Sequence, residues 1–261
     1  MASTGMYSIM EIKNELDLKA SKTTIHSVLS ECPYLEYCKK KVSPNLKEAN
    51  FQERIAFALE YIRTPSIWSK TIFSDEKKFN LDGPDGVQYY WEDLRNNEHQ
   101  EYSKRRNGGG GFMVWGCFSS KGKSELAILE GKINSQKYVY ALSEYMLPFA
   151  HVNYGTDFLF QQDNAPIHVS KEANEIFMGE EIKLIKWSAK SPDLNPIENL
   201  WGYMVNKMYE NGKQFQTKKE LKDSLLETWD RILDDLLVTL LASMPNCCLE
   251  LHASRGRKID Y

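Results

Sequence analysis

Cysteine is scarce in this sequence, and its few cysteines follow no metal-binding or disulfide pattern. There are five, an odd number, and no two of them form a Cys-x-x-Cys pair. Structural zinc sites and small disulfide-bonded folds both depend on characteristic cysteine spacings. We therefore expect free thiols in a reducing compartment, with neither a zinc site nor a disulfide framework.

Long apolar runs are also lacking. The stretch LLVTLLASM near residue 240 is much shorter than the roughly 18 residues that a membrane span needs. The first residues, MASTGMYSIMEIKNELDLK, become charged too soon to supply the apolar core of a signal peptide. These absences predict a soluble, intracellular protein that does not bind a membrane.

An excess of positive charge is absent as well. The formal net charge is −3, so the overall charge gives no indication of a nucleic-acid partner. Carboxylates that hold catalytic metals count as negative until the metals bind, so a nucleic-acid partner is not excluded. The local basic clusters 39–41 and 104–106 could contact phosphates, or they could be solvated charged faces.

What the sequence does contain is enough material for one good-sized domain and a small one. It has 261 residues, of which 42% are hydrophobic and 26% charged. Residues 1–32 predict two short helices, with Ser21 or Thr23 capping the second. The pair could be a helix-turn-helix or a plain helical hairpin. In the first case, the second helix would present four side chains to a DNA groove, namely Lys22, Thr24, His26 and Ser27.

The rest of the chain predicts a connector followed by an α/β domain. Residues 33–67 contain a polar, basic segment with two prolines and then the helical pattern FQERIAFALEYI, which suits a linker and a connecting helix. Within 68–261, strand patterns come first and then alternate with helical patterns. This order predicts a mixed sheet flanked by helices.

Three carboxylates occupy positions that suggest chemistry. Asp75 lies within an apolar strand, and Asp163 directly follows another, where burial is costly without a partner or a metal. Glu198 falls in the first turn of a predicted helix. If its role is only structural, its carboxylate interacts favourably with the helix dipole there. Two divalent metals about 3.5–4 Å apart can drive phosphodiester cleavage, and carboxylate oxygens are the ligands that Mg²⁺ prefers. Together the three predict a two-metal nuclease site.

Four sequence blocks around these carboxylates resemble the transposases of the Tc1/mariner superfamily. In chain order the blocks are SDEKKF, GGGGFMVWGCFS, QQDNAPIH and SPDLNPIENLWG. Between Asp163 and Glu198 lie 34 residues, the spacing of the DD34E signature of the Tc1 and Tc3 branch. The resemblance runs from about residue 68 to the C-terminus. Several blocks in the right order are far more specific than one short motif.

The resemblance implies a ribonuclease-H-like catalytic domain that performs cut-and-paste DNA transposition. Asp75, Asp163 and Glu198 would be the catalytic ligands of two Mg²⁺ or Mn²⁺ ions, with Asp75 bridging both. One strand would be hydrolysed at the element's end, and the freed 3′-hydroxyl would attack a TA target. The implied partners are double-stranded DNA and a second copy of the chain, and the implied compartment is the nucleus. Asn164 and His168 would contact DNA or position other groups, and for His168 we favour a structural role over general base.

One departure from the family concerns the N-terminal region. Relatives usually carry two helix-turn-helix units and a basic linker before the catalytic domain, whereas this sequence has room for one unit. We therefore expect an N-terminally shortened transposase that reads its DNA ends poorly. An alternative is a catalytically silent DNA-binding or dimerising remnant. A third, a nuclease acting on RNA, is disfavoured because helix-turn-helix modules read the major groove of duplex DNA.

Overall fold

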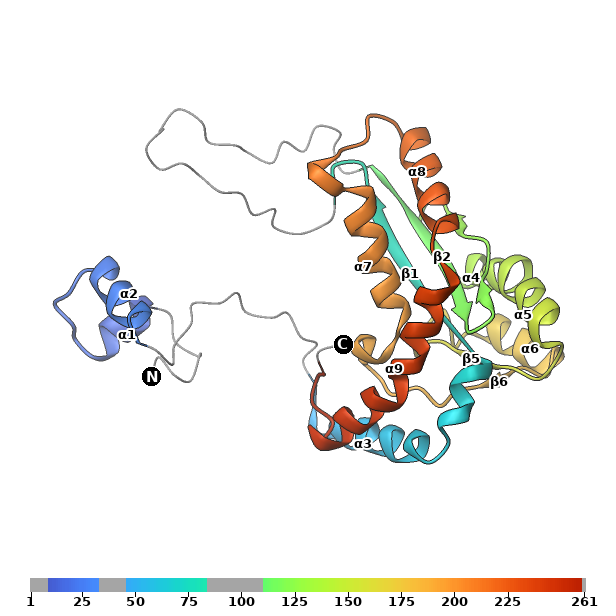
Figure 1. Ribbon diagram of the computed structural model, residues 1–261, viewed down its shortest axis with the longest axis horizontal. Helices are drawn as coiled ribbons and strands as arrows, with labels where there is room; N and C mark the ends of the chain where they lie inside the picture. The colour runs from blue at the N-terminus through green and yellow to red at the C-terminus, as the bar shows by residue number, and fades with distance from the viewer. Residues whose placement is uncertain (1–8, 33–45, 84–109, 260–261) are drawn as a thin grey trace. The chain divides into compact units, whose positions relative to one another are not determined.

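The computed structural model describes residues 9–32, 46–83 and 110–259 (Figure 1). Its contacts divide the chain into two compact units, residues 1–44 and 45–261. The basic clusters 39–41 and 104–106 lie outside the described residues, so their interpretation as phosphate contacts stays a prediction.

The first unit contains two short helices, α1 (Ile9–Glu15) and α2 (Lys22–Ser30). Ser21, one of the two cap candidates from the sequence, is the N-cap of α2: its backbone is extended, and its Oγ accepts a hydrogen bond from the Thr24 N–H at 3.1 Å. Such a bond satisfies one of the backbone donors that the first helical turn leaves unpaired. Ile25 is the buried residue of α2.

The second unit is built on a mixed sheet of six strands. The strands are β1 (Thr71–Asn80), β2 (Gly111–Ser119), β3 (Gly122–Lys123), β4 (Ala127–Leu129), β5 (Leu159–Gln161) and β6 (Lys183–Leu184). The central strand, β1, pairs antiparallel with β2 and parallel with β5, and β5 in turn pairs parallel with β6. Two short strands, β3 and β4, both pair antiparallel with β2.

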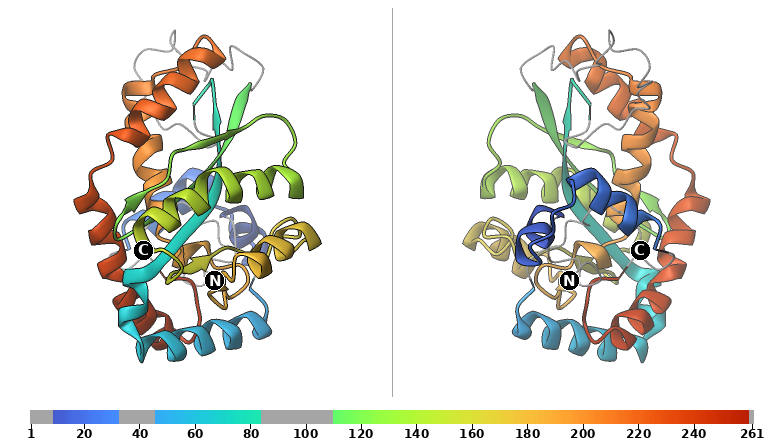
Figure 2. Two further views of the ribbon diagram at one scale, coloured as in Figure 1. Left: turned by 90° about the vertical axis from the view of Figure 1, so that its right-hand side faces the viewer. Right: turned by 90° about the vertical axis from the view of Figure 1, so that its left-hand side faces the viewer.

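Helices cover both faces of this sheet, as Figures 1 and 2 show, so the predicted architecture of a mixed sheet flanked by helices is confirmed. One face carries α3 (Glu48–Ile62), α7 (Ile197–Met208), α8 (Lys218–Asp230) and α9 (Asp234–Ala253). The other carries α4 (Ser135–Ala141), a π-helical turn (Leu142–Met146), α5 (Leu147–Tyr154) and α6 (Lys171–Gly179). Short 3₁₀ segments span Pro65–Lys70, Pro192–Leu194 and Glu210–Gly212.

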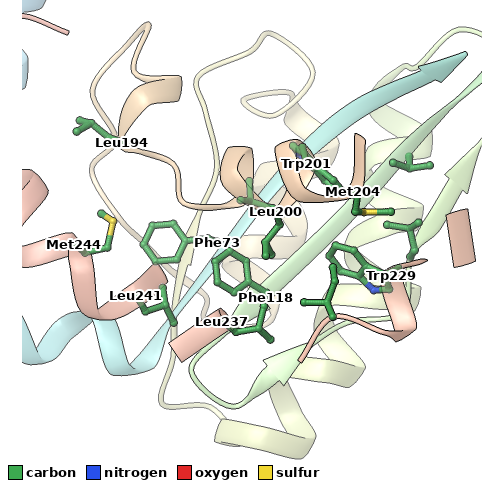
Figure 3. Packing of buried hydrophobic residues seen from close by; sticks show 14 of the residues in the cluster. Phe73, Phe118, Leu194, Leu200, Trp201, Met204, Trp229, Leu237, Leu241 and Met244 are labelled. Atoms are coloured by element: carbon green, nitrogen blue, oxygen red, sulfur yellow. The ribbon is translucent and has the colours of Figure 1, made fainter. Parts of the chain in front are cut away.

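Alternation along the central strand assigns its side chains to two separate cores. Phe73 packs in the core beneath α3, α7, α8 and α9, and the neighbouring Ile72 packs in the core beneath α4, α5 and α6. Successive side chains of a strand point to opposite faces, so a central strand needs apolar residues on both sides. In the first core, Trp201 of α7 stacks on Trp229 of α8 with ring centroids 5.5 Å apart (Figure 3).

Helix α3 belongs to the second unit and packs along α9. The sequence led us to group it with the linker, between the two domains. Phe57 and Tyr61 of α3 are buried in the core of the second unit, which explains the placement.

Helix α9 is long and apolar enough to cross a membrane by length and composition alone. However, Leu237, Leu241, Met244 and Leu251 on one side of it are buried in the core shared with α3 and β2. A helix with one face buried in a protein core can be equally long and apolar. The packing of these four residues identifies α9 as a core helix of this kind.

Candidate active site

Asp75 lies in the middle of the central strand, on the face that α7 covers. Its Oδ2 accepts a hydrogen bond from the indole Nε1–H of Trp201 at 3.0 Å. Its partner across the antiparallel pair is Gly116. A Cβ at Gly116 would lie 3.2 Å from the Trp201 ring and 3.1 Å from the Trp229 ring. Glycine therefore leaves the space in which the indole reaches the carboxylate.

Strand pairing brings Asp163 to the same place on the sheet. β1 and β5 run parallel, and Phe73 is paired with Gln161. Asp75 and Asp163 each lie two residues beyond this pair, Asp75 still within β1 and Asp163 just after the end of β5. This is the region outside the carboxyl end of a strand where α/β proteins commonly bind ligands.

Ser74 ties the backbone of all three carboxylate-bearing segments together. Its N–H donates to Gln161 Oε1 at 3.1 Å, and its Oγ donates to the Gln161 carbonyl at 2.8 Å. The side-chain amide of Asn195 donates to the Ser74 carbonyl at 3.0 Å. Ser74 precedes Asp75, while Gln161 and Asn195 stand two and three residues before Asp163 and Glu198 respectively. The three candidate ligands therefore start from segments that are connected by hydrogen bonds at Ser74.

Glu198 occupies the first turn of α7, where a carboxylate interacts favourably with the helix dipole. The loop before it is fixed by a buried arginine from α3. Arg54 forms an ion pair with Asp193 and also donates to Ser191 Oγ and to the Gly256 carbonyl, both at 2.7 Å. Segments from α3, the loop before α7 and the C-terminal region therefore meet at one guanidinium group.

The electrostatics of Asp75 and Glu198 are those of crowded acidic groups. Burial raises the pKa of Asp75 to about 8, and the negative charges of Glu198 and Glu76 add to the effect. Burial also raises the pKa of Glu198, whereas the ammonium group of Lys77 acts in the opposite direction. Lys77 Nζ lies 3.9 Å from Glu198 Oε2. A site of this kind gains stability when a cation neutralises it.

Asp163 has a different environment, because it is bound to His168. Its Oδ1 contacts His168 Nδ1 at 2.5 Å and accepts a hydrogen bond from the Ala165 N–H at 2.9 Å. Burial alone would raise the pKa of Asp163, but these hydrogen bonds and the imidazolium charge outweigh it and lower the pKa. Burial would lower the pKa of His168, but its contacts with Asp163 and Glu76 raise it to about 10.

The predicted DNA-contacting residues fall into two groups. Lys22, Thr24, His26 and Ser27 are all exposed on α2 in the first unit. Asn164 is exposed beside Asp163, with its amide donating to the Trp187 carbonyl at 3.1 Å. His168, in contrast, is buried, and both of its ring nitrogens face carboxylates of the protein. Its ring nitrogens therefore contact protein carboxylates, and the ring is not presented to DNA.

The site also contains residues that sequence reasoning missed. Trp201 was not singled out as a site residue, but it fills the core beneath α7 and also donates to Asp75. Glu76 and Lys77 were not singled out, although both lie next to the predicted ligands in the SDEKKF block. The alternation of a strand was the available signal: it places Lys77 on the same face as Asp75, and Glu76 on the other.

The donor set suits a hard divalent cation, although the side chains are not gathered around one point. Within residues 9–32, 46–83 and 110–259, no three His, Cys, Asp or Glu side chains converge closely enough to hold an ion. Asp163 is turned toward His168, and Glu198 lies near Lys77. The hydrogen bonds at Ser74 bring the three carboxylate-bearing segments together, and coordination would require the Glu198 side chain to turn from Lys77 toward Asp75 and the Oδ2 atom of Asp163.

Comparisons of sequence place these residues in a known family. A family model described as DDE superfamily endonuclease matches residues 70–222. The chain is 42% identical over 260 residues to the transposable element Tc3 transposase of Caenorhabditis elegans, covering 100% of this chain and 78% of the relative. It is 32% identical over 248 residues to the Tc1 transposase of the same organism, covering 92% of this chain and 88% of the relative.

Solved structures give the same fold at lower sequence identity. The Mos1 transposase paired-end complex with left transposon end matches with a TM-score of 0.78 and 18% identity, covering 99% of this chain and 77% of that one. The catalytic domain of Mos1 mariner transposase matches with a TM-score of 0.66 and 19% identity, covering 84% and 100%. These matches confirm the predicted ribonuclease-H-like fold. By its sequence and its fold, the chain belongs to the Tc1/mariner superfamily of DDE-type DNA transposases.

Proposed function

We propose that this chain cuts DNA at transposon ends and joins the freed 3′ ends to target DNA, using two Mg²⁺ or Mn²⁺ ions held by Asp75, Asp163 and Glu198. The observation that carries the proposal is the set of hydrogen bonds at Ser74, which connects the three ligand-bearing segments. Solved relatives with this fold include Mos1 paired-end complexes with Mn and with Mg, which supports the choice of metals.

Each residue contributes a separate physical function. Two divalent ions bound by such carboxylates activate the attacking oxygen and stabilise the departing one. Asp75, whose pKa is raised by burial, releases its proton when a cation binds, and the Trp201 indole orients its Oδ2. Lys77 compensates the charge of Glu198 while no cation is bound.

The DNA partner and the cellular setting complete the proposal. Helices α1 and α2 would act as a helix-turn-helix, with Lys22, Thr24, His26 and Ser27 facing a groove of duplex DNA. A homodimer on DNA would pair two transposon ends, with TA as the target sequence. The solved Mos1 relatives described as paired-end and strand transfer complexes support this arrangement. Because the substrate would be chromosomal DNA, we place the activity in the nucleus.

A nicking assay on a labelled duplex tests the proposal. Wild-type protein should cut in Mg²⁺ or Mn²⁺ and not in EDTA, and Asp163→Asn and Glu198→Gln should each abolish cutting. Asp157→Asn is the matched control, because Asp157 forms only an exposed ion pair with Lys70, which contributes little. A folded, DNA-binding wild type that never cuts would favour the catalytically silent alternative. Cutting by Asp163→Asn at the wild-type rate would falsify the ligand assignment.

A further inference from the structure

His168 connects a metal-ligand candidate to an acidic residue that has no role in the proposed reaction. Its Nδ1 lies 2.5 Å from Asp163 Oδ1, and its Nε2 lies 3.0 Å from Glu76 Oε1. The side chains of His168 and Glu76 are only 5% and 14% exposed, whereas that of Asp163 is 56% exposed. A protected pair therefore holds a carboxylate that is itself largely exposed to solvent just after the end of β5.

Other contacts fix the imidazole independently of either carboxylate. The Tyr138 ring lies against it with centroids 4.2 Å apart and an interplanar angle of 37°. The Tyr138 hydroxyl donates to Gln162 Oε1, and Gln162 Nε2 donates to the His168 carbonyl at 3.2 Å. The His168 N–H also donates to the Ala165 carbonyl at 2.9 Å. The ring therefore has a defined position, from which its Nδ1 reaches Asp163.

Glu76 completes this arrangement from the opposite face of the central strand. It follows Asp75 directly, so the two side chains point to opposite sides of the sheet. Glu76 reaches His168 on the side where Tyr138 packs, while Asp75 contacts Trp201 on the other side. One strand thus supplies a proposed ligand on one face and, on the other face, the residue that supports the ligand from β5.

We propose that Glu76 and His168 are positioning residues that set the metal-binding orientation of Asp163. Glu76 fixes the ring, and the ring donates through Nδ1 to Oδ1, which also accepts the Ala165 N–H. With both bonds on Oδ1, Oδ2 is the oxygen we assign to the metal. This inference rests on the proposed function, because it takes Asp163 to be a ligand. Hydrogen bonds of this kind to ligating groups typically change metal affinity by about 10–100-fold when removed.

Mn²⁺ titration calorimetry on the full chain tests the inference without requiring catalysis. Glu76→Ala and His168→Phe should weaken Mn²⁺ binding by about 10–100-fold. His168→Phe keeps an aromatic ring against Tyr138 but removes both ring nitrogens, and with them the contacts to Asp163 and Glu76. Glu76→Gln should bind nearly as wild type, because its amide can still hydrogen-bond to Nε2. Glu250→Gln, an exposed change on α9, is the matched control and should not alter binding.

Thermal melting of the same variants separates positioning from a purely structural role. A structural role predicts a lower melting temperature with unchanged Mn²⁺ affinity in the folded variants, and that result would overturn the inference. If His168→Phe does not fold, Glu76→Ala carries the test. In cleavage assays, the positioning role predicts a raised Mg²⁺ requirement with activity recovered at high Mg²⁺.

The two proposals fail in different ways. If wild-type protein binds no Mn²⁺, the carboxylate assignment fails and the positioning inference fails with it. If wild type binds Mn²⁺ and Asp163→Asn does not, while Glu76→Ala and His168→Phe bind as wild type, only the positioning inference is wrong.

Discussion

The guanidinium group of Arg54 and the carboxylate of Asp193 form a buried ion pair with two parallel hydrogen bonds. Nη1 donates to Oδ1 at 2.8 Å, and Nη2 donates to Oδ2 at 2.6 Å. The Arg54 side chain is fully buried, and that of Asp193 is 6% exposed. Because Asp193 stands five residues before Glu198, this pair links helix α3 to the segment that carries a proposed metal ligand.

Breaking this pair should strongly destabilise the second unit. Arg54→Met leaves Asp193 buried without its partner, and such losses typically cost about 3–5 kcal/mol. Urea unfolding should show this decrease in the free energy of unfolding. The matched change Arg231→Met removes an exposed ion pair with Glu227 and should cost about 0.5 kcal/mol or less. Equal effects of the two substitutions would contradict a structural role for the buried pair.

Gly256 should not tolerate a side chain. Its φ is +75°, and a Cβ there would lie 2.5 Å from the Phe51 carbonyl oxygen of α3. Gly256→Ala should therefore lower the free energy of unfolding by more than about 1 kcal/mol. Gly202→Ala, within α7 and with open space around the added Cβ, should instead raise it by up to about 1 kcal/mol. Chemical denaturation of both variants checks the opposite signs.

The stability of metal-free protein should depend on pH through Asp75. Its pKa is about 8 in the folded state and near 3.8 ordinarily, so folding favours the protonated form. The stability that this group contributes is fully present below pH 3.8 and is lost as pH rises toward 8. Asn cannot ionise, so Asp75→Asn removes this loss of stability. The variant should therefore melt at least about 2–4 °C higher than wild type at pH 8, with a smaller difference at pH 5.

Calorimetric scans in EDTA at the two pH values measure this difference. Adding Mg²⁺ provides the control: it should stabilise wild-type protein much more than Asp75→Asn, because the variant has lost a ligand. A gain for Asp75→Asn that is the same at pH 5 and pH 8 would argue against a raised pKa.

DNA binding by the first unit should be salt-sensitive and only weakly selective, because one small module makes few base contacts. Lys22→Ala should weaken binding about equally for different sequences and reduce the slope of log affinity against log salt by about 1. Fluorescence anisotropy with labelled duplexes over a range of salt measures both quantities. Lys13→Ala on α1 is the charge-matched control. Tight, sequence-specific binding at physiological salt would disagree with this picture.

The sequence by itself determined the local elements and the three acidic residues. Periodicity predicted the strand that carries Asp75, the cap candidates Ser21 and Thr23 predicted the start of α2, and the blocks around Asp163 and Glu198 identified the family. These features depend on residues a few positions apart, whose preferences act before the chain folds. The spacing of 34 residues between Asp163 and Glu198, which matches the DD34E signature, supplied the rest, so the candidate ligands could be named without coordinates.

Only the tertiary structure decided which groups support those ligands. Glu76 and His168 are 92 residues apart, and Arg54 and Asp193 are 139 apart. No local pattern encodes such pairs, because their meeting depends on parallel pairing of β1 with β5 and on the packing of α3 along α9. A histidine or a buried arginine has many possible partners in a sequence. Strand register and helix packing reduce them to one, because a close-packed interior fixes the position of each buried side chain.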